Sequence, residues 1–235
     1  MYDKLCTLPA CVRAAGQNRR FMRYKISNNV IRRLPKYIRF LEMLESSGAV
    51  RVSSQELGEL MGLTASQIRQ DFNCFGGFGQ QGYGYNVQQL REAMAEIMGI
   101  DTEHTAIVIG AGNLGKAIIA NFKFKKFGYK LLAAFDVCPD VVGKTLNDTP
   151  VYHVDKLEEY ILTNKVDVAA LTLPGEYAAA TVTRLTKCGV PGIWNFTRLE
   201  FPPEHNGSKI ENVHLADSLL VLSYALKPKT SEETE

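Results

Sequence analysis

Apolar residues in the first third of the chain recur at helical spacing, beginning near residue 28. Ser27 is of a type that caps helices, and we expect a short helix from there to Leu34. Pro35 fits the first turn of a second helix, whose apolar face continues to about residue 45 and which Gly48 ends. The pattern therefore predicts two helices that meet at the proline.

Two shorter helices follow, each opened by a capping box. Ser53-x-x-Glu56 precedes one short apolar run and Thr64-x-x-Gln67 precedes the next, with Gly62 between them. Two short helices joined by a turn that contains glycine are typical of a helix-turn-helix motif.

The second of these helices has outward positions suited to DNA. In a helix-turn-helix the second helix enters the major groove, where arginine pairs with guanine and glutamine or asparagine with adenine. The candidate residues are Ser66, Gln67, Arg69, Gln70 and Asn73. A helical hairpin with a solvated polar face is the alternative interpretation.

The next stretch, residues 75–85, alternates glycines with aromatic residues. Its five glycines and four aromatics favour a tight hairpin packed on the helices, because glycine permits turns with positive φ. We interpret it as a wing whose tip, Gln80-Gln81, reaches a minor groove, with a flexible linker as the alternative. An amphipathic helix over residues 87–98 and Gly99 complete a winged-helix domain over residues 28–99.

The second half of the chain alternates strands and helices and opens with a dinucleotide-binding pattern. The apolar strand Thr105–Ile109 runs into Gly110, Gly112 and Gly115 in the spacing G-x-G-x-x-G. In a dinucleotide site these glycines make the tight turn, admit a pyrophosphate and let helix pack on strand. Ordinary glycines of a strand-to-helix loop are the alternative.

A carboxylate at the end of the next strand strengthens this interpretation. Asp136 ends the apolar strand 131–135 and lies 21 residues beyond Gly115, where an acid accepts the ribose hydroxyls of adenosine. An acid there also repels a 2′-phosphate, so NAD(H) is favoured over NADP(H), with a related nucleotide or CoA site as the alternative. The candidate cofactor residues of this part are Gly110, Ala111, Gly112, Asn113, Leu114, Gly115, Asp136 and Val137.

Three more strands are expected at residues 151–154, 166–171 and 192–196. They alternate with a helix over residues 156–163, capped by Asp155, and a helix over residues 176–188. Open α/β sheets bind ligands at the carboxyl ends of their strands. The candidates there are Thr172, Leu173, Pro174, Asn195 and Phe196.

The last predicted element, a helix over residues 216–226, is apolar almost all round. Such a helix must be buried on most sides. Because it lies near the end of the chain, we expect a second subunit to cover it, in a homodimer. Residues 100–235 are thus interpreted as a Rossmann-type nucleotide-binding and dimerisation domain.

The two halves of the chain differ in net charge. Residues 1–85 hold 12 Lys/Arg and 6 Asp/Glu, a net +6, whereas the rest hold 15 and 19, a net −4. A basic front half favours a polyanionic partner. Residues 1–25 alone supply +5, and residues 1–27, which lack periodicity, are interpreted as a disordered extension or an arm for the DNA backbone.

Composition argues against several other classes. No apolar run approaches the ~20 residues of a membrane span, and no signal-peptide pattern is present. The five cysteines form no C-x-x-C pair, so we expect a reduced cytoplasmic chain without a metal site.

Catalytic patterns are weak. Tyr152-x-x-x-Lys156 resembles a reductase pattern, but the two residues straddle a predicted strand end and helix start, and we take the match as chance. The four histidines show no partner spacing. We therefore expect a protein that binds a cofactor without using it chemically, and no enzyme.

A winged helix joined to an NAD fold with an apolar C-terminal helix is similar to the Rex family of redox-sensing transcriptional repressors. The resemblance spans about residues 26–227. Its carriers are Val30-Ile-Arg-Arg-Leu-Pro-Lys-Tyr37, Thr64-Ala-Ser-Gln-Ile-Arg-Gln-Asp71, Phe78-Gly-Gln-Gln-Gly-Tyr-Gly-Tyr85, Gly110–Gly115, Phe135-Asp136 and Asn195-Phe196.

The resemblance implies a homodimer that exchanges its C-terminal helices and places two nicotinamides near the dimer centre. It implies binding to a palindromic operator when NAD+ prevails and release when NADH binds. Arg39 and Tyr85 match positions that link the winged helix to the cofactor domain, so Tyr85 joins the cofactor candidates. Further DNA-binding candidates are Arg32, Arg33, Lys36, Tyr37 and Ser53.

The sequence also departs from the family pattern. The wing tip is usually Lys-Arg and is Gln80-Gln81 here, and Gln70 stands where lysine is common. His214 takes a position often held by aspartate, so one hinge ion pair of the family is in doubt. The alternative function is an NAD- or CoA-binding enzyme subunit whose N-terminal helices serve oligomerisation.

Overall fold

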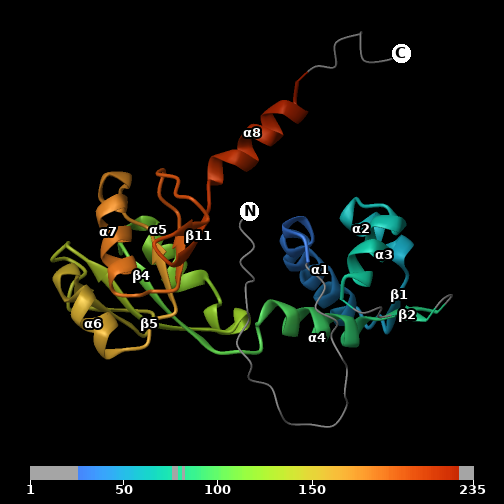
Figure 1. Ribbon diagram of the computed structural model, residues 1–235, viewed down its shortest axis with the longest axis horizontal. Coiled ribbons are helices and arrows are strands. Elements are labelled where there is room, and N and C mark those ends of the chain that lie inside the picture. The colour runs from blue at the N-terminus through green and yellow to red at the C-terminus, as the bar shows by residue number, and fades with distance from the viewer. Residues whose placement is uncertain (1–25, 76–78, 81–82, 228–235) are drawn as a thin grey trace, which may run out of the picture. The chain divides into compact units, whose positions relative to one another are not determined.

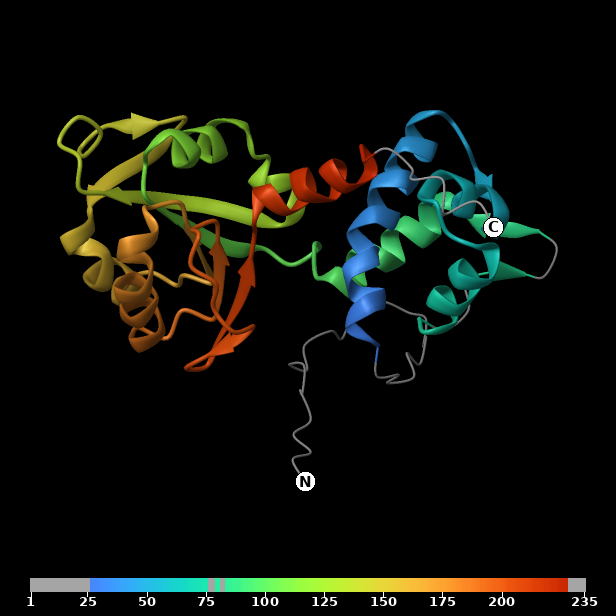
Figure 2. The same cartoon turned by 90° about the horizontal axis from the view of Figure 1, so that it is seen from above.

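The computed structural model describes residues 26–75, 79–80 and 83–227. The chain divides after Met98 into two compact units, which Figures 1 and 2 show from two directions. Residues 1–25 and Gln81, for which an extension and a DNA contact were expected, lie outside the described residues.

The first unit is a winged helix. Its elements are α1 (Asn28–Ser46), β1 (Arg51–Val52), α2 (Ser54–Met61), α3 (Ala65–Asn73), β2 (Gly79–Gln80), β3 (Gly84–Asn86) and α4 (Val87–Met98). The three strands form one antiparallel sheet in the order β1-β3-β2. The two short helices predicted after Ser53 and Thr64 are therefore present as α2 and α3, and β2 and β3 pair as the predicted hairpin requires.

Helix α1 corrects the first prediction, because it runs through Pro35 without a break. Proline removes one backbone hydrogen bond from a helix interior. Burial compensates for that loss, since Leu34, Tyr37 and Leu41 on either side of the proline are almost completely buried. Ser27 precedes the helix but makes no side-chain cap.

The first predicted capping box forms in full, whereas in the second only the Thr64 cap forms and the Gln67 side chain donates to Asp71. The Ser53 side chain accepts a hydrogen bond from the Glu56 backbone N–H, and the Glu56 carboxylate accepts one from the Ser53 N–H. Thr64 caps α3 by accepting from the Gln67 N–H. Between the two helices Gly62 has φ +67°, a conformation that glycine adopts without strain.

A buried carboxylate joins α1 to α3. Asp71 is 1% exposed; Arg33 donates to both of its oxygens, each at 2.7 Å. The Tyr37 hydroxyl donates to it at 2.8 Å and the Gln67 amide at 3.0 Å. Burial raises the pKa of Asp71, but these hydrogen bonds and the charge of Arg33 outweigh burial and hold it below the ordinary value.

The second unit is a doubly wound α/β fold. Its elements are β4 (His104–Ile109), α5 (Asn113–Asn121), β5 (Tyr129–Asp136), β6 (Thr145–Leu146), β7 (Thr149–His153), α6 (Leu157–Thr163), β8 (Val168–Leu171), α7 (Gly175–Lys187), β9 (Gly192–Asn195), β10 (Glu204–His205), β11 (Ser208–Asn212) and α8 (Leu215–Ala225), with 3₁₀ turns η1 (Phe124–Phe127) and η2 (Val154–Lys156). The sheet order is β10-β11-β9-β8-β4-β5-β7-β6. Its six central strands are parallel.

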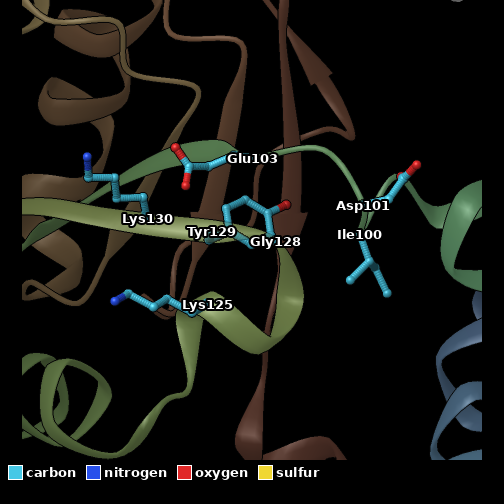
Figure 3. A pocket seen from close by; sticks show the side chains of 7 residues that line it. All are labelled: Ile100, Asp101, Glu103, Lys125, Gly128, Tyr129 and Lys130. Atoms are coloured by element: carbon cyan, nitrogen blue, oxygen red, sulfur yellow. The ribbon is translucent and has the colours of Figure 1, made fainter. Parts of the chain in front are cut away.

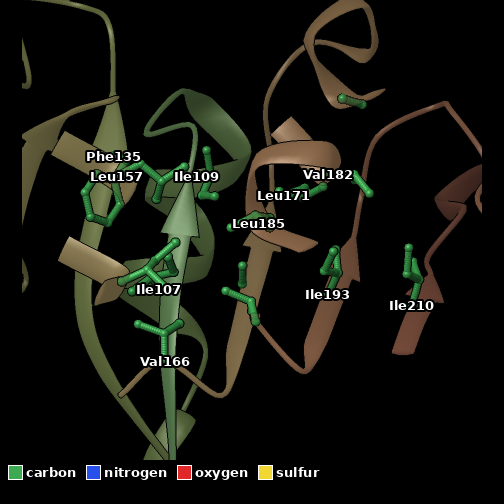
Figure 4. Packing of buried hydrophobic residues seen from close by; sticks show 14 of the residues in the cluster. Ile107, Ile109, Phe135, Leu157, Val166, Leu171, Val182, Leu185, Ile193 and Ile210 are labelled. Carbon is green, nitrogen blue, oxygen red and sulfur yellow. The ribbon is translucent and has the colours of Figure 1, made fainter. Parts of the chain in front are cut away.

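Alternation along β4 builds a core on each face of the sheet. Ile107 and Ile109 pack on one face with residues of α6 and α7, as Figure 4 shows. Ala106 and Val108 pack on the other face with residues of α5. All four side chains are essentially buried, so β4 is a central strand with its carboxyl end held in place from both sides.

Several boundaries differ from those predicted. The β10–β11 hairpin and β6 were not anticipated: β10 and β6 are two-residue strands at the two edges of the sheet, and β11 is a five-residue strand between β10 and β9. Asp155 does not cap α6; it lies in η2, whose capping residue is His153, and its backbone N–H donates to the His153 ring.

Helix α8 leads away from the sheet after β11 (Figure 1). None of its residues is buried, and Leu220, Val221 and Tyr224 are each about 70% exposed. Within the described chain its apolar surface is therefore left uncovered, as the sequence pattern requires of a helix that meets another subunit.

Replacing the buried carboxylate should loosen the winged-helix unit. We expect Asp71→Asn to destabilise α3 by about 2 kcal/mol, because Arg33 loses its counter-ion and Tyr37 an acceptor. Amide hydrogen exchange in α3 should then accelerate roughly thirty-fold, with β4 unaffected. The exposed Glu59→Gln variant is the matched control.

The same difference should depend on pH. Because the folded pKa of Asp71 lies below its ordinary 3.8, the stabilisation is present above that value and is lost as pH falls through the folded pKa. Equal exchange in wild type and Asp71→Asn near neutral pH would show that the carboxylate contributes nothing.

Candidate cofactor site and nucleic-acid interface

The turn between β4 and α5 is shaped by two glycines. Gly110 has φ +99°, its N–H donates to Phe135 O at 2.8 Å, and its carbonyl accepts from the Thr172 hydroxyl at 2.6 Å. A Cβ on Gly115 would lie 1.9 Å from the Gly110 carbonyl oxygen. Both positions therefore require glycine for the fold itself.

Gly112 is different. It is the N-cap of α5 with φ −73° and ψ −162°, an extended conformation open to any residue. A Cβ there would meet nothing within 4 Å, so the chain itself gives no reason for a glycine. A ligand that approaches the backbone at the start of α5 supplies that reason, since helix N-termini bind phosphate.

Asp136 lies beside this turn at the end of β5. One carboxylate oxygen accepts from the Ala111 N–H and the other from the Cys138 N–H, the latter at 2.7 Å. Each oxygen has a second lone pair for a ribose hydroxyl. The carboxylate thus ties the glycine turn to the loop that begins at the exposed Val137, with Asn113 and the half-buried Leu114 opening α5.

The strand order places this turn at the topological switch point, where strands stop being added on one side of β4 and begin to be added on the other. Strands β4 and β8 are neighbours, and from them the order runs outward in opposite directions. Open α/β sheets bind ligands at this switch point. Thr172 and Leu173 follow β8 and lie within 3 Å of the position a Gly110 Cβ would occupy, with Pro174 next along the chain at the start of α7.

The Asn195 side chain, which was predicted to contact the cofactor, lies inside the fold. It is 0% exposed, and its amide nitrogen donates to Leu199 O and to Asn212. Its amide oxygen accepts from the backbone and hydroxyl of Thr197. All of its polar atoms are engaged within the fold, so it shapes the loop that carries Phe196, whose ring packs on Trp194 with centroids 4.4 Å apart.

Tyr85 belongs to β3 of the winged-helix unit. Its ring meets Phe72 edge-on with centroids 4.8 Å apart, as expected for an aromatic residue that pins the wing. Its expected part in cofactor binding stays a prediction.

A pocket of about 490 Å³ lies at the opposite edge of the sheet. Figure 3 shows Glu103, Lys125, Tyr129 and Lys130 around it, at the amino ends of β4 and β5. The switch point is at the carboxyl ends of those strands, so this pocket is distinct from the candidate cofactor site.

Helix α3 presents a polar surface in the first unit. Ser66, Arg69, Gln70 and Asn73 are exposed, and the Arg69 guanidinium donates to the Ser54 hydroxyl at 3.0 Å. That contact holds the arginine between α3 and the start of α2, where the predicted contact Ser53 is the N-cap.

Four of the predicted DNA contacts make hydrogen bonds inside the unit. Tyr37 is 0% exposed and, with Arg33 and Gln67, binds Asp71. The prediction that Tyr37 contacts DNA is therefore wrong, because Tyr37 is a core residue. Arg33 and Gln67 orient α3. Lys36 donates to Met61 O at 2.6 Å and so closes the end of α2.

The remaining candidates and the missed residues lie near the helix start and the wing. Arg32 is exposed on α1, and Gln80 ends β2. Sequence reasoning passed over Ser54, whose hydroxyl accepts from Arg69, and Arg51, which donates to the Tyr83 carbonyl at the wing. Ser54 could have been found from its position one residue after a helix cap.

Comparison with known proteins identifies both units. The family described as putative DNA-binding protein N-terminus matches residues 25–73, and the family described as CoA binding domain matches residues 101–199. The redox-sensing transcriptional repressor Rex of Caldicellulosiruptor bescii is 47% identical over 91% of this chain and 98% of its own length. The Rex of Clostridium tetani is 48% identical over 86% and 95%.

The chain belongs to the Rex family of redox-sensing transcriptional repressors. Solved structures agree: RSP, in complex with NAD+ and operator DNA, aligns with TM-score 0.80 and 47% identity over 86% of this chain and 92% of its own. RSP in complex with NADH aligns with TM-score 0.79 and 44% identity over 86% and 94%. Rex relatives are repressors, so the enzyme alternative falls away.

Within the described ranges, no helix is long and apolar enough to cross a membrane. No group of His, Cys, Asp or Glu suited to a metal ion occurs in the same part of the chain.

Replacing Gly112 and Gly115 separately should distinguish a glycine that ligand binding requires from a glycine that the fold requires. We expect Gly112→Val to keep the melting temperature within about 2 °C and to weaken NADH binding roughly tenfold or more, because its Cβ fills the ligand's approach. Gly115→Ala should lower both the melting temperature and the affinity for NADH, since the added Cβ overlaps the Gly110 carbonyl oxygen. Calorimetric titration with NADH measures the affinities, and wild-type affinity in Gly112→Val would contradict the assignment.

Proposed function

We propose that this chain represses transcription as a homodimer that binds operator DNA through its two winged-helix units and is released when NADH binds. The observation that carries the proposal is one chain in which an exposed, polar helix α3 accompanies a glycine turn with open space at Gly112. The relative RSP has been solved with NAD+ and operator DNA and with NADH, which supports both partners.

The cofactor binds along the carboxyl edge of the sheet. Its pyrophosphate lies at the start of α5 against Gly112 and Asn113, and the ribose hydroxyls of adenosine bind Asp136. Because the same carboxylate repels a 2′-phosphate, NADH is bound in preference to NADPH. The nicotinamide end reaches the loop that Asn195 shapes, near Phe196. The bound cofactor supplies no reaction here; its oxidation state is the signal.

The operator is read by α3. Arg69 and Gln70 contact base edges in the major groove, with Ser66 and Asn73 at the flanks. The Asp71 network holds α3 at a fixed position on α1. The departures at Gln70 and at the wing tip bear on which operator is preferred.

The dimer is held by helix α8, exchanged between subunits. Its six large apolar residues are all exposed in the single chain, a surface that a soluble monomer does not leave in water. At its start His214 has a buried Nε2 without a hydrogen-bond partner among the described residues. A second subunit covers the apolar surface and brings a partner to that nitrogen.

Release follows from differential affinity. NADH shifts the dimer only as far as it binds the released form more tightly than the DNA-bound form. The dihydronicotinamide ring is neutral whereas the ring of NAD+ is a cation, and burial at an apolar dimer centre disfavours the charged ring. The repressor acts in the cytoplasm, where it meets both the chromosome and the NADH pool.

Operator binding tests this function directly. Footprinting on the promoter of the protein's own gene defines an operator, and fluorescence anisotropy of that duplex is then measured with NADH, NAD+ and NADPH. We expect NADH to weaken binding roughly 5- to 150-fold, NAD+ to leave it strong, and NADPH to act only at much higher concentration.

The rival function gives a different result. If the chain oxidised NADH with a substrate while promoter fragments stayed unbound at every cofactor concentration, it would be an enzyme subunit. Equal effects of NADH and NAD+ on operator affinity would contradict redox sensing even if DNA binding were found.

A further inference from the structure

The wing of this protein has an unusual distribution of charge. Gln80, which ends β2, and its neighbour Gln81 carry no charge. The β2–β3 hairpin nevertheless projects beyond the helices of its unit (Figures 1 and 2). A wing that projects without a cation at its tip has little attraction for phosphate.

A cation reaches the wing from the neighbouring strand. Arg51 begins β1 and pairs with Asn86 of β3. Its side chain is exposed, and its Nη1 donates to the Tyr83 carbonyl oxygen at 3.0 Å. Among the described acidic residues none forms an ion pair with Arg51, so no carboxylate of the described residues neutralises its charge.

Tyr83, whose carbonyl accepts from Arg51, is 70% exposed, which is a large exposure for an aromatic side chain. Tyr85, two residues later, packs inward on Phe72, and alternation along a strand would turn Tyr83 inward too. Gly84 between them has φ +67°, and a Cβ there would lie 2.8 Å from Val52 O. The glycine breaks the alternation and turns Tyr83 outward.

Arg51 on β1 therefore places a cation against the backbone of the wing at Tyr83, whose own side chain is exposed. A core role does not account for either side chain, since both are exposed. Arginine donates to phosphate in a fixed fork, and a phenol ring packs on sugars while its hydroxyl reaches a phosphate. Beside a recognition helix in the major groove, the surface that a wing meets is the backbone at the edge of the adjacent minor groove.

We propose that Arg51 and Tyr83 are the DNA contact of the wing: Arg51 binds a backbone phosphate and Tyr83 packs against the sugars beside it. This inference rests on the proposed function and adds two residues to its DNA-binding surface. Because phosphates and sugars carry no direct sequence information, the pair strengthens binding to every operator to a similar extent.

The salt dependence of operator affinity tests the arginine. In the full-length dimer without NADH, we expect Arg51→Gln to weaken operator binding on the order of tenfold and to reduce the slope of log K against log salt by about 1.8, one phosphate from each wing. Arg51→Lys should keep most of the slope. Lys187→Gln, which removes an exposed charge at the end of α7 in the second unit, is the matched control and should change neither.

The tyrosine has its own signature. Tyr83→Ser should weaken binding severalfold to the operator and to a duplex with altered bases alike, with the salt slope unchanged, and Tyr83→Phe should retain most of the affinity. NADH binding and melting temperature, unchanged in all these variants, show that the fold is intact.

Two results would overturn the proposal. One is wild-type affinity and slope in Arg51→Gln. The other is weakened binding with an unchanged slope, which would mean that Arg51 only braces the wing through Tyr83. If the wild type bound no operator at all, the proposed function would fail and this inference with it, whereas normal wild-type binding with an unaffected variant would refute the wing contact alone.

Discussion

The structure depends on a lack of space at the first turn of the nucleotide-binding unit. Gly115 packs so closely on the Gly110 carbonyl that no side chain fits between them, and the Thr172 hydroxyl binds that carbonyl from β8. Helix α5 is thereby pressed against the switch point of the sheet, with its N-terminal N–H groups directed outward over Gly112. The turn therefore lies beside the carboxyl ends of three neighbouring strands, β4, β5 and β8.

A comparable constraint governs the DNA-binding unit. Asp71 is buried on α3, and its oxygens are satisfied from α1 by Arg33 and Tyr37. This fixes α3 on α1 and leaves Arg69 and Gln70 outside. The cofactor turn and helix α3 are thus each held by contacts within their own unit. The apolar surface of helix α8 takes part in neither set of contacts and is uncovered in the described chain.

Local signals made much of this predictable from the sequence. Capping residues are neighbours of the groups they cap, so Ser53 and Thr64 marked α2 and α3, and the glycine spacing with Asp136 marked the cofactor turn. Contacts between distant residues left no such signal. Burial on both sides of Pro35 keeps α1 continuous, and Tyr37 meets Asp71 across 34 residues. Asn195 is satisfied by Asn212 of β11, an element that the pattern did not predict.

Redox sensing requires that NADH binding and operator binding be energetically coupled, and coupling of binding free energies is reciprocal. Its most direct test is the affinity for NADH measured by calorimetry twice, on the free dimer and on the dimer saturated with operator. We expect operator DNA to weaken NADH binding by the same factor by which NADH weakens operator binding. Equal NADH affinity with and without operator would contradict it.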